Sequence, residues 1–175
     1  IDGSKFILVT NSDIEDCCLD DSAKKIGKVD LKQQKFVVSH SEVLLLSKMG
    51  PKFKVGITDC SDGGKYLVSS NLYALEVNKD KLEPYYLLYF LNSEAGRELL
   101  KNNSAGTNIP TLNNDDIKNL DIPFPDKKVQ KKLAEEMRLT VKKIHDAKRA
   151  YKKKIQDLDD TFNNLIDSIK EKGDD

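Results

Sequence analysis

The chain has 175 residues, and its 29 Lys and Arg side chains balance 29 Asp and Glu, so its formal net charge is zero. That length is enough for one domain with a buried core, and no stretch approaches the roughly 20 apolar residues that a membrane helix needs. A neutral chain argues against indiscriminate binding to nucleic acid, which depends on neutralising phosphates, but not against a site-specific reader with a local basic face.

The cysteines indicate the redox compartment of the chain, and its first residue indicates whether it is part of a longer protein. Cys17, Cys18 and Cys60 are odd in number and include an adjacent pair, which indicates a reducing compartment rather than a disulfide framework. We therefore expect a cytoplasmic protein. The chain begins at Ile1 rather than Met, and strand-like residues follow almost at once, so we also expect a fragment or a processed form of a longer chain.

The first half of the chain predicts a series of short strands, because runs rich in β-forming residues are bounded by polar turns. These runs are residues 6–9, 36–38, 43–47, 54–58, 66–69 and 72–77. Between them, residues 10–17 indicate a turn or a single helical turn capped by Thr10 or Ser12. Residues 19–34 are polar and irregular, which is typical of an exposed loop. The sequence Asp62-Gly63-Gly64 predicts a hairpin turn between the strands on either side of it.

Helices are predicted after the strands. Pro84 stands at a helix start, where its missing N–H costs nothing, and residues 93–101 predict a second helix. Pro123 and Pro125 end an extended apolar stretch, and Asp126 can cap the helix that follows. The sequence therefore predicts an α+β fold: a small mixed-sheet domain with short helices over residues 1–125, then one long helix over residues 126–175.

The long helix carries an apolar seam of the coiled-coil type. Apolar residues recur every seven positions, with Lys148 as the one polar exception. A helix of about 45 residues is roughly 68 Å long, against roughly 30 Å for the body, so we expect the helix to project and to need a partner. Its first half is basic and its second half acidic, which favours an antiparallel pair. The predicted helix-pairing residues are Met137, Val141, Ile144, Tyr151, Ile155, Leu158, Phe162, Leu165 and Ile169.

No catalytic residue, metal site or cofactor is predicted. His40 and His145 are far apart in sequence, and no Cys-x-x-Cys spacing is present. The sequence from Asp62 to Lys65 lacks the glycine spacing and the Ser or Thr of a phosphate-binding loop. Asp126 and Asp146 imitate part of a nuclease motif, but on one helix they would lie about 30 Å apart and could not share an ion.

What remains is recognition of a partner. If that partner is DNA, recognition needs basic and polar side chains on loops that can reach base edges and phosphates. Four groups of such residues precede the long helix, in the first long loop, in the segment after residues 43–47, around the predicted hairpin, and in the loop that contains Gly106. The candidate DNA-binding residues are Lys24, Lys25, Lys28, Ser47, Lys48, Lys52, Lys54, Lys65, Tyr66, Ser69, Ser70, Asn71, Thr107, Asn108 and Thr111.

Several short motifs occur in an order that is familiar from one family. A glycine loop, an extended segment ending in Ile-Pro-x-Pro and a helix that carries Gln-Lys-x-Leu-Ala-Glu follow one another, after similar segments at residues 42–50, 67–75 and 84–93. The motif residues are Gly106, Leu112, Asp116, Ile117, Leu120, Ile122, Pro123, Pro125, Gln130, Lys131, Leu133, Ala134 and Glu135. In this the chain resembles the specificity (S) subunit of type I restriction–modification systems.

The resemblance implies a non-enzymatic protein. Such a subunit normally carries two target-recognition domains, each followed by a long helix; the helices pair antiparallel, set the distance between two half-sites and dock the methyltransferase subunits. The implied partners are double-stranded DNA, an adenine methyltransferase (M) subunit, a restriction (R) subunit, and a second copy or second half through the helix. The chain departs from the family in lacking Trp and the usual opening segment. Two alternatives stay open: a coiled-coil adaptor that binds only protein, and the DNA-recognition tail of a single-chain methyltransferase or restriction enzyme.

Overall fold

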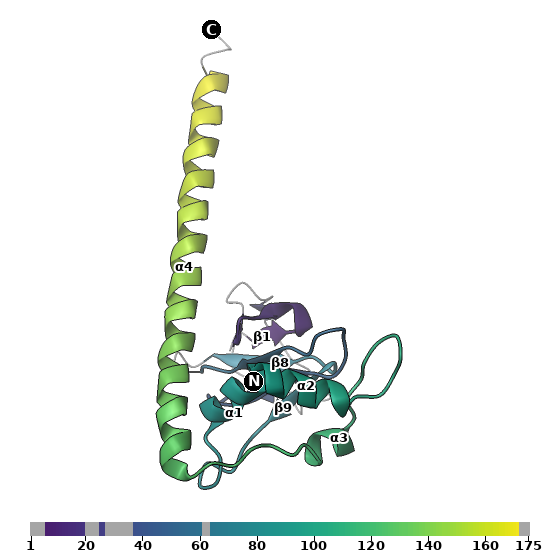
Figure 1. Cartoon of the computed structure of the whole chain (residues 1–175). Coiled ribbons are helices and arrows are strands. Elements are labelled where there is room, and N and C mark those ends of the chain that lie inside the picture. The colour runs from purple at the N-terminus through teal and green to yellow at the C-terminus, as the bar shows by residue number, and fades with distance from the viewer. Residues whose placement is uncertain (1–5, 20–24, 27–36, 61–63, 172–175) are drawn as a thin grey trace. The chain divides into compact units, whose positions relative to one another are not determined.

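The computed structural model describes residues 6–19, 25–26, 37–60 and 64–171 (Figure 1). The chain divides into two compact units, residues 1–139 and residues 140–175. Within these described residues, the first unit holds all the strands, the short α-helices α1 to α3 and the first turns of α4 (Lys127–Glu171), and the second unit holds the rest of α4.

One sheet of the first unit has four strands, in the order β4-β1-β8-β5. β1 and β8 run parallel, with Phe6 opposite Lys65 and Val9 opposite Val68, and the two outer strands pair antiparallel with them. The strands are β1 (Phe6–Val9), β4 (Lys25–Ile26), β5 (Val37–Val38) and β8 (Lys65–Val68).

A second sheet has three antiparallel strands in the order β7-β6-β9, so that β6 is central. A small hairpin of β2 and β3 packs on β7, where a Cβ on Gly56 would come within 3.1 Å of the Ile14 and Leu19 side chains. The turn of that hairpin has positive φ at Asp16 and Cys17, as a two-residue hairpin turn with the matching twist requires. The strands are β2 (Ile14–Glu15), β3 (Cys18–Leu19), β6 (Leu44–Ser47), β7 (Val55–Ile57) and β9 (Leu72–Leu75).

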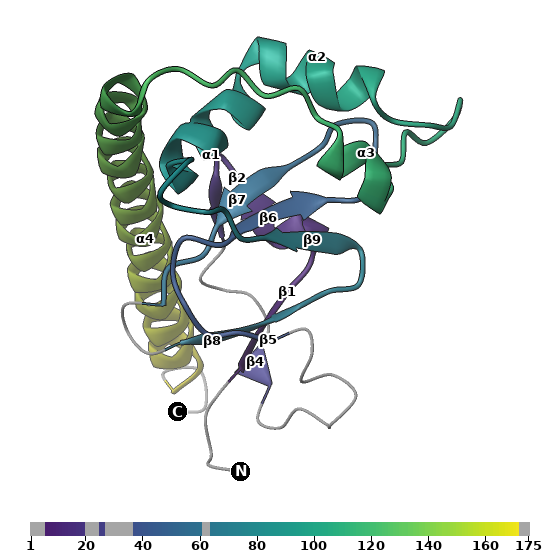
Figure 2. The ribbon, with the colours of Figure 1, turned by 90° about the horizontal axis from the view of Figure 1, so that it is seen from below.

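The core lies on both faces of β6, whose four residues are all fully buried. Leu45 belongs to a cluster with Val9, Val38 and Val68 of the four-stranded sheet. Leu44 and Leu46 point to the opposite face, because successive side chains of a strand alternate. On that face lie α1 (Pro84–Asn92) and α2 (Glu94–Asn102), so the unit has three layers: helices, the three-stranded sheet and the four-stranded sheet (Figure 2).

Local capping signals account for where the helices begin. Ser93 ends α1 and caps α2, its Oγ accepting from the Gly96 N–H at 3.2 Å. Asn113 caps α3 (Asn114–Lys118), its Oδ1 accepting from the N–H groups of Asp115 and Asp116 at 2.8 and 3.0 Å. Asp126 caps α4, because its Oδ1 accepts from the Lys128 and Val129 N–H groups at 2.9 and 3.0 Å.

The structure confirms most of the predicted elements and corrects two. The α+β class, both helices after Pro84 and the helical turn after Thr10 are confirmed. The hairpin predicted around Gly63 is wrong, because β7 pairs with β6 while β8 pairs with β1 and β5 in the other sheet. Of the loop predicted for residues 19–34, residues 20–24 and 27–34 lie outside the described part, and Lys25–Ile26 form β4. Among the residues described, no helix combines the length and the apolar character needed to cross a membrane.

Candidate nucleic-acid interface

Three of the segments predicted to contact DNA meet at one place, next to the ends of β6 and β9. The Lys48 N–H donates to the Asn71 carbonyl at 2.9 Å, and the Leu112 N–H donates to the Lys48 carbonyl at 2.8 Å. The Gly50 N–H donates to the Pro110 carbonyl at 3.1 Å. These backbone bonds hold segments that are about 20 to 60 residues apart in sequence as one surface. We call residues 48–54, 69–71 and 105–112 the loop junction.

The third segment of the junction is a closed loop. Ala105 and Thr111 exchange backbone hydrogen bonds of 2.9 and 2.8 Å, which tie the two ends together. Gly106 has φ of +103°, and a Cβ there would come within 2.7 Å of the Ile109 carbonyl, so only glycine fits. The tip therefore has a defined shape, and it exposes Thr107, Asn108 and Ile109, the last with 57% of its surface accessible.

Tyr73 in β9 supports the junction from below and was not among the sequence-predicted residues. Its hydroxyl donates to the Leu112 carbonyl at 2.9 Å, and the Lys48 ammonium lies 4.7 Å from the centre of its ring. Burial raises the pKa of the Tyr73 phenol, and the nearby Asp116 carboxylate raises it further, so the hydroxyl stays protonated and keeps donating. Successive side chains of a strand alternate between its two faces, so Leu72 lies in the core and Tyr73 on the other face. That alternation is the sequence signal by which Tyr73 could have been predicted.

Around the turn between β6 and β7, some of the predicted residues reach the surface and one is buried. Lys52 is exposed and Lys54 is half-buried. Ser47 is fully buried, and its hydroxyl accepts from the Lys54 N–H at 2.8 Å. Contact of Ser47 with DNA stays a prediction; in the structure this side chain closes the turn that presents the lysines.

Lys65 and Tyr66 lie in β8 of the four-stranded sheet rather than in the junction. The Lys65 ammonium is 6.0 Å from the Phe6 ring centre, and the Tyr66 hydroxyl donates to the Asp59 carbonyl at 2.7 Å while its ring packs on the core cluster. They remain candidates for DNA contact on a separate part of the surface.

The remaining candidates lie in the turn between β8 and β9, in the closed loop that contains Gly106, or in the first long loop. In that turn, Ser69 donates its N–H to the Val9 carbonyl at 2.9 Å and its Oγ accepts from the Asn71 N–H at 3.3 Å, while Ser70 is exposed. Thr111 is half-buried and its hydroxyl donates to the Ile109 carbonyl at 3.2 Å. Lys24, Lys28 and the side chain of Lys25 lie outside the described residues.

Groups that could hold a metal are not gathered in the part of the chain that the structure describes, where no three His, Cys, Asp or Glu side chains cluster. His40 instead forms an exposed ion pair with Glu76 at 3.2 Å. The side chains at the loop junction can therefore provide hydrogen bonds, positive charge and apolar contacts to a partner.

The predicted helix-pairing residues lie on α4. Those from Tyr151 onward are 42–69% exposed in the chain by itself, whereas Met137, Val141 and Ile144 are half-buried. Six large apolar side chains along one helix face are costly to leave in water. The pairing itself stays a prediction. The exposed six are Tyr151, Ile155, Leu158, Phe162, Leu165 and Ile169.

Comparison with known proteins gives a consistent result. Residues 5–157 match the family model described as the type I restriction modification DNA specificity domain. Over 116 residues the chain is 29% identical to a putative type I restriction enzyme MjaX specificity subunit of Methanocaldococcus jannaschii. That alignment covers 63% of this chain and 27% of the relative, so the chain matches about a quarter of the relative's length. The resemblance seen in the sequence is confirmed, and the chain belongs to the family of type I restriction modification DNA specificity domains.

Proposed function

We propose that the chain is the sequence-specific DNA-recognition component of a type I restriction–modification system and that it has no catalytic role of its own. It reads one half-site and directs an adenine methyltransferase subunit, and with it a restriction subunit, to that DNA. The observation that carries the proposal is the family match, which spans 153 of the 175 residues and includes the whole loop junction.

The geometry of the junction supports this role. A half-site is read by side chains that reach base edges, while backbone and lysine contacts to phosphates set the register. Thr107 and Asn108 at the tip of a closed loop can donate to and accept from base edges. Lys48 and Lys52 stand beside them for phosphates, and the exposed Ile109 offers an apolar contact of the kind a thymine methyl group makes. Because the loop is closed by its own hydrogen bonds, little ordering entropy is lost on binding.

The apolar seam of α4 supports a second partner. We propose that it pairs with α4 of a second copy, or with an equivalent helix of a second half, and that two recognition units are thereby held on two half-sites. The pairing is antiparallel, so that the basic first half of each helix meets the acidic second half of the other.

The test is a triple charge reversal, Lys48→Glu with Lys52→Glu and Lys54→Glu. The matched control places the same change on exposed positions of α4, Lys128→Glu with Lys131→Glu and Lys132→Glu. Affinity is measured by fluorescence anisotropy against duplexes that the native complex selects from a random pool, over a series of salt concentrations. Each phosphate contact contributes about 0.9 to the salt slope of log K, so the junction variant loses up to about 3 from that slope.

The outcomes separate the alternatives. Weaker, less salt-dependent binding in the junction variant but not in the control supports the proposal. Equal loss in both variants means that only net charge matters, and the junction assignment fails. If the unaltered protein selects no duplex at any salt concentration, the protein-only adaptor is favoured. Duplex selection that requires a methyltransferase domain in the same polypeptide favours the recognition tail of a single-chain enzyme.

A further inference from the structure

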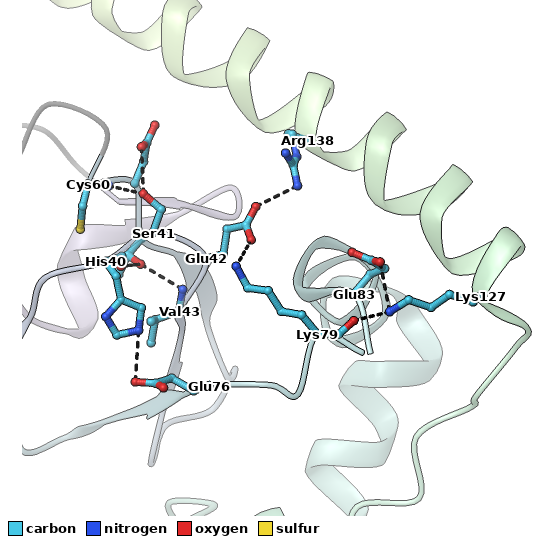
Figure 3. A network of polar contacts seen from close by, with 12 residues as sticks. His40, Ser41, Glu42, Val43, Cys60, Glu76, Lys79, Glu83, Lys127 and Arg138 are labelled. Atoms are coloured by element: carbon cyan, nitrogen blue, oxygen red, sulfur yellow. Dashed lines mark hydrogen bonds and ion pairs between the residues drawn. The ribbon is translucent and has the colours of Figure 1, made fainter. Parts of the chain in front are cut away.

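The base of α4 is fastened to the body of the first unit by a polar cluster centred on Glu42 (Figure 3). The Glu42 carboxylate accepts from Nη2 of Arg138 on α4 at 2.8 Å and, through its other oxygen, from the Lys79 ammonium. The Glu42 side chain is 19% exposed, whereas those of Arg138 and Lys79 are 50% and 60% exposed, so water partly screens both contacts. Glu42 and Arg138 are 96 positions apart in the chain.

Arg138 is held on a second side by an aromatic ring. Its guanidinium carbon lies 4.8 Å from the centre of the Tyr85 ring, within the range of a cation–π contact. Burial raises the pKa of the Tyr85 phenol despite the opposing effect of Arg138, so the ring stays neutral. A planar guanidinium held between a carboxylate and a ring has one defined orientation, which a lysine in its place would not have.

The backbone at Glu42 is strained, and its surroundings hold the strain. Glu42 has φ of +69°, a conformation that residues with a Cβ rarely adopt. Its N–H donates to the Thr58 carbonyl at 2.9 Å, and the buried Thr58 hydroxyl accepts from the Val43 N–H at 3.1 Å and donates to the His40 carbonyl at 3.0 Å. Such strain persists only where neighbouring structure imposes it, and it is concentrated where a side chain must be aimed.

A second attachment lies eleven positions earlier on α4. The Lys127 ammonium pairs with Glu83 at 3.1 Å and also donates to the Lys79 carbonyl. Eleven residues are close to three full turns, so Lys127 and Arg138 share one face of the helix and lie about 16 Å apart along it. One attachment would leave α4 able to pivot, whereas two on the same face fix both the axis and the rotation of its first turns.

We propose that Glu42 and Arg138 are positioning residues for DNA recognition: by fixing the rotation of α4 at its base, they restrict the spacing between the two half-sites that the assembly accepts. The inference rests on the proposed function. Adding one base pair between half-sites moves them apart by about 3.4 Å and rotates one against the other by about 35°. An assembly rejects the wrong spacing only if each recognition unit resists turning about its helix by that amount.

The test uses Glu42→Gln and Arg138→Met, which keep side-chain length and remove the charge. Glu76→Gln is the matched control, because it makes the same chemical change in the exposed ion pair with His40. The native complex is assayed on duplexes that carry the selected half-sites at the best spacing and at one base pair more or less. Both variants should lower the affinity ratio between best and neighbouring spacings by about tenfold, the effect of losing one charged hydrogen bond. Affinity for a duplex with a single half-site should change less than about twofold.

A second measurement needs no DNA. Nitroxide labels on unnatural amino acids at the exposed positions Arg97 and Leu139, both in the first unit, report a distance distribution by pulsed electron paramagnetic resonance. The distribution should broaden in both variants and stay unchanged in Glu76→Gln. An unchanged width in both variants overturns the attachment itself. A broadened distribution with an unchanged spacing ratio overturns its role in spacing, and failure of every protein to bind a half-site counts against the proposed function instead.

Discussion

The buried amide of Gln130 offers the sharpest test of how α4 is anchored. Gln130 is 1% exposed and makes three hydrogen bonds to backbone groups that precede it in the chain. Its Oε1 accepts from the Glu83 N–H at 3.1 Å, and its Nε2 donates to the carbonyls of Lys81 and Pro125 at 3.2 and 2.9 Å. Replacing Gln130 by Ala removes all three, and at about 1 kcal/mol for each hydrogen bond the loss is about 3 kcal/mol of unfolding free energy.

The matched control is Gln156→Ala on the same helix, where the side chain is exposed and bonds only to Asp160, at 2.9 Å, among the contacts described. Both substitutions change helix propensity equally, so the difference between them isolates the anchor. We expect urea unfolding, followed by tyrosine fluorescence at equal protein concentrations, to place Gln130→Ala about 3 kcal/mol below the control. A difference under about 0.5 kcal/mol, the scatter of ordinary surface changes, would refute the reasoning.

Two further predictions concern the seam of α4 and the buried phenols. Leu158→Asp with Phe162→Asp should convert the paired form to a single chain in light scattering, because each apolar side chain withdrawn from an interface removes about 2 kcal/mol of pairing free energy. The control, Asn163→Asp with Asn164→Asp, adds the same charge and should leave the mass unchanged. If the Leu158 and Phe162 variant keeps the paired mass, the predicted seam is contradicted. Burial raises the pKa of the Tyr85 and Tyr86 phenols above 10.0, so the folded chain binds more protons than the unfolded chain above that pH. The stability that these phenols contribute is complete below pH 10 and is lost as the pH rises above it. Between pH 9.5 and 11 the urea midpoint of unfolding should therefore fall, and it should fall less steeply in Tyr86→Phe. An equally steep fall in that variant would exclude Tyr86 as a contributor.

Several features could be read from the sequence because their causes are local. The prolines at 123 and 125 and the Asp126 cap mark the start of α4, and these signals act between residues only a few positions apart. The strand at residues 6–9 and the helix beginning at Pro84 were placed for the same reason. Motif order was also enough to indicate the family.

The features that only the tertiary structure decided are those made by contacts between distant segments. One example is β8, which could form a hairpin with β7 or pair with β1. Pairing with β1 buries Leu67 and Val68 with Val9, and the residues next to β8 in the sequence do not indicate this choice. The serine at 47 looks the same in sequence as an exposed one, yet it lies inside the central strand.

The candidate site divides in the same way. The sequence by itself determined that Lys48, Asn71 and Thr107 were on polar turns between strands or helices, since turn residues and apolar runs are local patterns. Their convergence in one junction, with Tyr73 beneath it, depended on backbone bonds between segments up to about 60 residues apart. The contact between Glu42 and Arg138 spans 96 positions and depends on a left-handed backbone held by Thr58. Such contacts form only when burial of the core brings both segments together, because the loss of chain entropy on closing so long a loop needs many cooperating contacts to offset it.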